Sequence, residues 1–73
     1  MKKSEFDNYS ATDICYVIDE WVHSERNRKL IKSALIDGCT YQELADMYDI
    51  TEQAAVKIVQ TNGERLLIKL KTL

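Results

Sequence analysis

The side chains best suited to chemistry in this 73-residue sequence are polar groups of the kind that recognise another molecule. Gln53 and Gln60 can hydrogen-bond adenine edges, and Thr51 can contact a phosphate or a thymine methyl group. The sequence contains no nucleophile beside a base, no metal-binding cluster and no phosphate-binding glycine loop. We therefore expect no enzymatic activity, no cofactor, no metal and no small-molecule substrate.

The cysteines agree with the absence of a metal site. Cys15 and Cys39 are separated by twenty-three residues, and neither has a Cys or His neighbour at metal-ligand spacing. We expect both to be small buried side chains in a reducing cytoplasm, with an incidental exposed thiol as the alternative. No apolar run approaches the length of about eighteen residues that a membrane span needs, so we expect a cytoplasmic protein without a membrane partner.

Length and composition describe one small globular domain. Hydrophobic residues make up 45 % of the chain and charged residues 30 %, which is the balance of a folded protein. The 10 basic and 12 acidic residues give a net charge of −2, which argues against a general nucleic-acid binder. Because a domain of this size buries only about 60 % of its unfolded surface, a stabilising partner chain is worth considering.

The absence of Pro and the presence of only two Gly favour an all-α fold of four or five helices. We expect a frayed terminus over residues 1–9 and a single helical domain over residues 10–73. The first helix begins after Ser10 or Thr12 and ends near residues 23–25. Its apolar face comprises Ile14, Val17, Ile18, Trp21 and Val22.

A second helix is predicted to begin near Ser24 and to end at Gly38, because Gly adopts the left-handed conformation at little steric cost. Its inward side chains are Leu30, Ile31, Ala34 and Leu35, and its outward basic side chains are Arg26, Arg28, Lys29 and Lys32.

Thr40 and Glu43 form the sharpest local signal, because their spacing is that of a capping box that opens a helix. A short helix follows, and residues 49–51 interrupt its pattern. Thr51 is suited to cap the next helix, which buries Ala55, Ile58, Val59 and Asn62. Whether the segment from residue 64 to residue 73 continues that helix or is separated from it at Gly63 stays open, because a helical Gly costs about 1 kcal/mol relative to Ala.

Two helices joined by about three residues predict a helix-turn-helix over about residues 40–62. The motif needs a small residue where the helices cross and an apolar residue in the turn, and Ala45 and Ile50 supply them. Ala55 and Ile58 then anchor the second helix.

Residues 38–45, with the sequence GCTYQELA, resemble the Gly-x-Thr-Tyr-x-Glu-Ile-Ala opening of region four of bacterial sigma factors and its small phage and mobile-element relatives. Residues 48–51 are similar to the turn of that family, and residues 64–67 look like its helical tail. Ala55, Ile58 and Leu66 fall on family core positions. The resemblance covers about residues 27–73, whereas residues 1–26 match no family.

The resemblance implies double-stranded DNA as the partner, with residues 51–62 as the recognition helix in the major groove. Gln53, Lys57 and Gln60 are then nearest the bases. The candidate DNA-binding set is Thr51, Glu52, Gln53, Val56, Lys57, Gln60 and Thr61, with Arg26, Arg28, Lys29 and Lys32 on phosphates. Family members carry several basic residues on this helix, whereas Lys57 is the single one here.

The net charge of −2 conceals four blocks of alternating sign. Residues 1–25 carry two basic and six acidic groups, residues 26–36 carry four basic groups, residues 37–52 carry five acidic groups, and residues 53–73 carry four basic groups and one acidic group. The basic blocks either reach phosphates or neutralise the acidic blocks within the fold.

Four further residues need separate interpretation. Val56 and Ile68 fall outside the inward stripes, so they are either isolated surface residues or part of a self-association surface. Trp21 is predicted to be in the core, and His23 to be a packed or partly solvated side chain.

The sequence thus predicts a small cytoplasmic DNA-binding transcriptional regulator. The alternative is a protein-interaction module that keeps the fold without binding DNA, and that contacts RNA polymerase, another regulator or a second copy as a homodimer.

Overall fold

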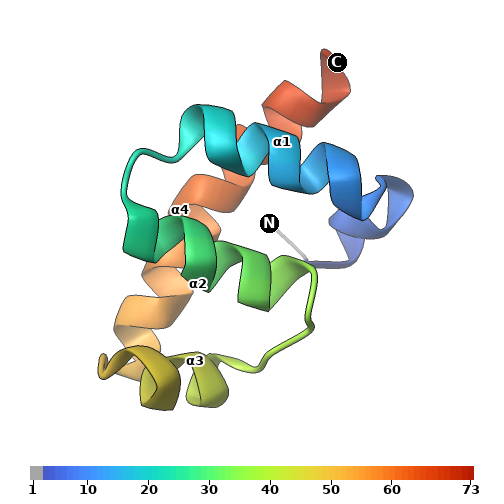
Figure 1. Ribbon diagram of the computed structural model, residues 1–73. Helices are drawn as coiled ribbons and strands as arrows, with labels where there is room; N and C mark the ends of the chain where they lie inside the picture. The colour runs from blue at the N-terminus through green and yellow to red at the C-terminus, as the bar shows by residue number, and fades with distance from the viewer. Residues whose placement is uncertain (1–2) are drawn as a thin grey trace.

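Four α-helices follow a short 3-10 helix in the computed structural model, which describes residues 3–73 (Figure 1). The elements are η1 (Lys3–Asn8), α1 (Ala11–Trp21), α2 (Glu25–Leu35), α3 (Tyr41–Tyr48) and α4 (Glu52–Lys71). No strand occurs among the described residues, so the predicted all-α class is confirmed.

Hydroxyl side chains begin all four α-helices. Ser10, Ser24, Thr40 and Thr51 each accept a hydrogen bond from the backbone N–H three residues further on, at 3.0–3.3 Å. Each such bond satisfies one of the N–H groups that a helix start leaves without a partner. Ser10 rather than Thr12 is therefore the cap of α1, and the predicted starts of α2 and α3 are confirmed.

Two glycines have opposite roles. Gly38 has a φ of +72°, the left-handed conformation that the sequence predicts for it, but α2 ends at Leu35, three residues before this glycine. Gly63 is buried in the middle of α4, which continues through it without a break. The structure thus resolves the alternative that the sequence left open at this position.

Helix α4 is the element on which the others assemble. It spans 20 residues, about 30 Å at 1.5 Å per residue, in a molecule whose longest dimension is 33 Å. It contacts α3 near its N-terminal end, α1 near its C-terminal end and α2 between them (Figure 1). The buried residues of α4 are Ala55, Val59, Gly63, Leu66, Leu67 and Leu70.

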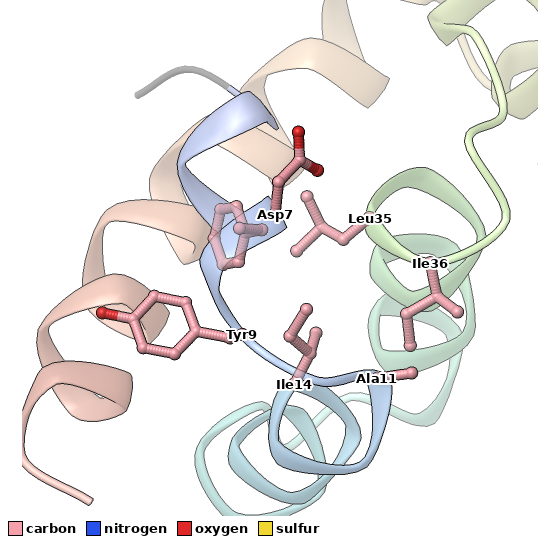
Figure 2. A pocket seen from close by; sticks show the side chains of 7 residues that line it. Asp7, Tyr9, Ala11, Ile14, Leu35 and Ile36 are labelled. Carbon is pink, nitrogen blue, oxygen red and sulfur yellow. The ribbon is translucent and has the colours of Figure 1, made fainter.

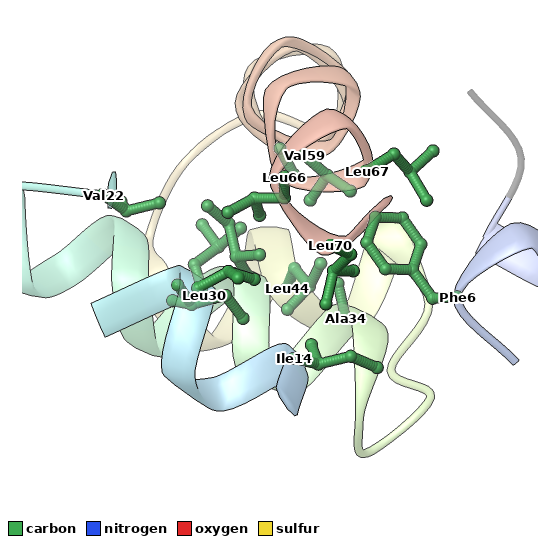
Figure 3. Close-up of a cluster of buried hydrophobic side chains, with 14 residues drawn as sticks. Phe6, Ile14, Val22, Leu30, Ala34, Leu44, Val59, Leu66, Leu67 and Leu70 are labelled. Atoms are coloured by element: carbon green, nitrogen blue, oxygen red, sulfur yellow. The ribbon is translucent and has the colours of Figure 1, made fainter. Parts of the chain in front are cut away.

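The N-terminal segment departs from the expected frayed terminus. Residues 3–8 form η1, and Phe6 is only 2 % exposed. Phe6 belongs to the same core cluster as Leu67 and Leu70, and Figure 3 shows its ring directed toward the α4 side chains. For residues 1–2, the expectation of fraying lies outside the described residues.

The prediction that Trp21 belongs to the core is wrong. Trp21 is the last residue of α1 and is 52 % exposed, whereas the next residue, Val22, is buried. Lys69 places its Nζ atom 4.0 Å from the centre of the Trp21 ring, in cation–π geometry.

Cys15 and Cys39 are partly rather than fully buried, and both thiols are free. His23 is exposed and Asn62 is half-buried, with the Asn62 amide donating to the Ile58 carbonyl at 2.8 Å. Among residues 3–73, no helix combines the length and apolar character that crossing a bilayer would require.

Replacing Phe6 with Ala tests the role of η1. Loss of a buried aromatic side chain costs about 3–5 kcal/mol, which is a large part of the roughly 5–15 kcal/mol that holds a domain folded. We expect a matching loss in the free energy of unfolding, measured by urea denaturation followed by circular dichroism. The exposed neighbour Asp7→Ala is the control, and an equal effect of the two substitutions would contradict the assignment of Phe6 to the core.

Candidate nucleic-acid interface

Helices α3 and α4 are joined by a tight turn in which one carbonyl receives two hydrogen bonds. Asp49 has a φ of 55° and ends α3, and the N–H groups of Asp49 and Ile50 both donate to the Ala45 carbonyl. Asp tolerates this left-handed conformation better than most residues do. Thr51 then caps α4, so three residues separate the two helices as the sequence predicts.

The four predicted contact positions of the motif lie in its interior. Ala45 and Ala55 are buried, and Ile50 and Ile58 are partly buried against the core cluster. Small side chains at the first two positions permit close approach of the helices, and the two isoleucines fill the remaining space.

The outward side chains of the predicted recognition helix differ in their exposure to solvent. Thr51, Glu52, Gln53, Lys57 and Thr61 are exposed, whereas Val56 and Gln60 are half-buried. The exposed set carries one positive and one negative charge, so it offers polar groups but little net attraction for phosphates.

Gln60 takes part in a contact that the sequence reasoning missed. Its amide Nε2 donates to the Tyr41 hydroxyl at 3.2 Å and so links α4 to the start of α3. Lys3 lies on the same tyrosine, with its Nζ atom 4.3 Å from the ring centre, and it donates to the Cys39 carbonyl at 3.1 Å. Helix periodicity places Tyr41 on the inner side of α3, but it does not reveal which α4 side chain meets its hydroxyl.

The basic side chains of α2 are largely engaged within the fold. Lys32 pairs with Asp19 of α1 at 2.7 Å, and Lys29 pairs with Glu25 at 3.6 Å. These two pairs fit the interpretation that the basic block neutralises acidic neighbours, although such exposed pairs contribute only about 0–1 kcal/mol each.

The two arginines of α2 differ in accessibility. Arg26 is exposed and donates to the side-chain oxygen of Asn27, whereas Arg28 is half-buried and donates to the His23 carbonyl at 3.4 Å. The buried Nε atom of Arg28 has no hydrogen-bond partner within residues 3–73. No hydrogen bond or ion pair in that part of the chain joins these basic groups to the outward side chains of α4.

Glu43 closes the capping box of α3. Its Oε1 atom accepts from the Thr40 backbone N–H at 2.9 Å, and its own N–H donates to the Thr40 hydroxyl at 3.1 Å. The backbone hydrogen bond, and secondly the hydrogen bond with the Thr40 side chain, hold the pKa of Glu43 below its ordinary value of 4.5.

The structure does not bring Val56 and Ile68 together. Twelve residues separate them, which is about 18 Å along α4. Ile68 is 61 % exposed and lines a groove of about 390 Å³ with Trp21, His23, Arg65 and Lys69, none of which is in the predicted DNA-binding set. We call these five residues the Trp21 groove.

A second, smaller pocket of about 230 Å³ opens where η1, the start of α1 and the end of α2 meet (Figure 2). The residues that line it are Phe6, Asp7, Tyr9, Ala11, Ile14, Leu35 and Ile36. None of the predicted site residues lines it.

No group of three potential metal ligands occurs within residues 3–73. Comparison of the chain with protein-family models, with curated proteins and with solved structures gives no match.

The lowered pKa of Glu43 predicts a pH-dependent contribution to stability. The contribution is complete above pH 4.5, where the carboxylate is ionised in both states, and is lost as the pH falls through the lower pKa of the folded state. We expect Glu43→Gln to have a lower free energy of unfolding than the unchanged protein at neutral pH. In acid, where the Glu43 carboxylate is protonated, the two free energies should become equal. Urea denaturation from pH 7 to pH 3 measures both proteins, and a difference that stays constant with pH would contradict the carboxylate contact.

Replacing Tyr41 with Phe removes the acceptor of the Gln60 amide and leaves the ring in place. We expect a loss of about 0.5–1.5 kcal/mol, the usual net value of one hydrogen bond. Tyr16→Phe is the matched control, because Tyr16 is exposed and its change should stay within about 0.5 kcal/mol. Equal thermal stability of Tyr41→Phe and the unchanged protein would contradict the role of this bond.

Proposed function

We propose that this domain is a small DNA-binding transcriptional regulator of the sigma-region-four-like helix-turn-helix type. The N-terminal half of α4, about residues 51–62, enters the major groove of double-stranded DNA. The observation that carries the proposal is the arrangement of α3, its left-handed Asp49 turn and the capped α4, which leaves a polar face outward. The resemblance of residues 38–51 to sigma factors supports the same function.

In this proposal the exposed side chains of α4 read the bases. Gln53 forms paired hydrogen bonds with an adenine, and Lys57 contacts a guanine or a phosphate. Gln60 contributes from the edge of the interface, because its Nε2 atom is held by Tyr41 and its amide oxygen remains as an acceptor.

In this proposal the basic block of α2 supplies the phosphate contacts. Its side chains differ in the internal ion pairs that they must give up to reach a phosphate. Arg26 is exposed and needs no rearrangement of an ion pair. Lys29 and Lys32 exchange a carboxylate partner for a phosphate, so they add less affinity than unpaired lysines would. The expected binding is therefore weak, with a shallow dependence on salt.

Protein interaction is the second candidate function. Two observations favour it: the exposed Trp21 and Ile68 side chains in one groove, and the acidic residues that surround α3 and the start of α4. RNA polymerase, another regulator or a second copy would then be the partner, and Gln53 and Lys57 would have no role.

Fluorescence anisotropy with duplexes selected from a random pool tests the DNA-binding proposal. Lys57→Ala should lower the slope of log affinity against log salt by about one, because the interface then has one positive charge fewer and releases fewer counterions from the DNA. Gln53→Ala should reduce the discrimination between selected and scrambled duplexes by about 1–3 kcal/mol.

Lys71→Ala is the matched control, because Lys71 is exposed on the same helix about 21 Å further along the axis. We expect it to leave both the slope and the discrimination unchanged. Absence of binding at micromolar protein in low salt would overturn the proposal and favour the interaction module.

A further inference from the structure

The Trp21 groove combines exposed apolar surface with positive charge. Trp21 and Ile68 are 52 % and 61 % exposed, and both line the groove. Arg65, Lys69 and His23 are its remaining lining residues, and none of the five is acidic. A complementary partner therefore presents an apolar side chain next to carboxylates.

Helix α3 presents such a surface on its outer side. Met47 is 58 % exposed. Asp46, the residue before it, and Glu43, four residues before it, are also exposed. Residues 43, 46 and 47 share one side of the helix, because residues three and four apart are neighbours on a helix surface. Residues 37–52 carry five acidic groups and no basic group. We call Glu43, Asp46 and Met47 the Met47 face.

The two surfaces cannot meet within one chain. The Met47 face belongs to α3, which packs at the N-terminal end of α4, whereas the groove lies at residues 65–69 of the same continuous helix. From Glu52 to Ile68 the helix axis covers about 24 Å. A second copy of the chain can bring the two surfaces together.

We propose that the Trp21 groove binds the Met47 face of a second copy, so that two chains associate head to tail. In this contact the Met47 side chain lies between Trp21 and Ile68, and Asp46 approaches Arg65 and Lys69. A symmetric contact of two grooves would instead place Arg65 and Lys69 of one copy against those of the other, with like charges opposed.

The contact is small, so the association is weak and depends on concentration. Stable interfaces bury about 1,200–2,000 Å² in total, and a five-residue groove covered by part of an eight-residue helix lies at or below the lower end of that range. The electrostatic part weakens with added salt, because both surfaces are exposed to solvent. Gln53 and Lys57 take no part, so the inference does not rest on DNA binding.

Two single substitutions at exposed positions test the proposal. Ile68→Asp places a negative charge in the groove and leaves the Met47 face intact, whereas Met47→Asp removes the apolar side chain and leaves the groove intact. Because both side chains are more than half exposed, the variants should fold, and thermal unfolding followed by circular dichroism verifies this. Tyr16→Asp is the control, on an exposed residue of α1 outside both surfaces.

Sedimentation from micromolar to millimolar concentration gives the readout. We expect the average mass of the unchanged protein and of Tyr16→Asp to rise with concentration, and each of the other variants alone to remain monomeric. An equimolar mixture of Ile68→Asp and Met47→Asp should form a dimer, because one intact groove meets one intact Met47 face. Trp21 is the single tryptophan of the chain, so its emission should shift to shorter wavelength in the mixture and not in the separate variants.

Three results would overturn the proposal. The first is an unchanged protein that stays monomeric throughout the concentration range. The second is a mixture in which the two variants do not associate. The third is association without a change in Trp21 emission, which would place the contact on another surface.

Discussion

The buried face of α4, against which the other helices pack, is the constraint on which the rest of the structure depends. Ala55 and Val59 lie in the half that meets α3, and Leu66 and Leu70 lie in the half that meets α1. Gly63 stands between these two groups and is buried. Because one helix supplies both halves of the core, the helix-turn-helix and the N-terminal helices cannot pack independently.

The charged residues of α2, of α3 and of the second half of α4 make different kinds of contact. The basic residues of α2 lie close to carboxylates or carbonyls of the same chain, as Lys32 does with Asp19. The acidic residues of α3 have fewer such partners, and Glu43 is used for the capping box. Arg65 and Lys69, in the second half of α4, instead line the same groove as the exposed Trp21 and Ile68. A net charge of −2 therefore describes none of these surfaces.

Local signals in the sequence predicted the helices well, because each depends on neighbouring residues alone. The capping box of Thr40 and Glu43, the caps at Ser24 and Thr51, and the left-handed conformation of Gly38 all depend on residues within a few positions. The interior positions of the helix-turn-helix followed from the same periodicity. These signals were sufficient for the all-α class and for the position of the turn.

Features that depend on distant residues were not predictable in the same way. Phe6 stands in a polar segment, and only its packing against α4 makes it a core residue. Trp21 follows the apolar spacing of α1, yet it is exposed while its neighbour Val22 is buried. The continuity of α4 through Gly63 depends on burial against neighbouring helices, which outweighs the low helix propensity of Gly. The Gln60 contact with Tyr41 likewise joins residues 19 positions apart.

The unbroken course of α4 also limits how this chain can tolerate insertions. Each added residue advances a helix by about 1.5 Å and turns it by about 100°. A single insertion near Gly63 would therefore rotate every residue from Leu66 onward away from α1, even though the turn at Asp49 would be unaffected. The chain should consequently tolerate inserted residues in the loop before α3 and around residues 22–24, and not within its second half.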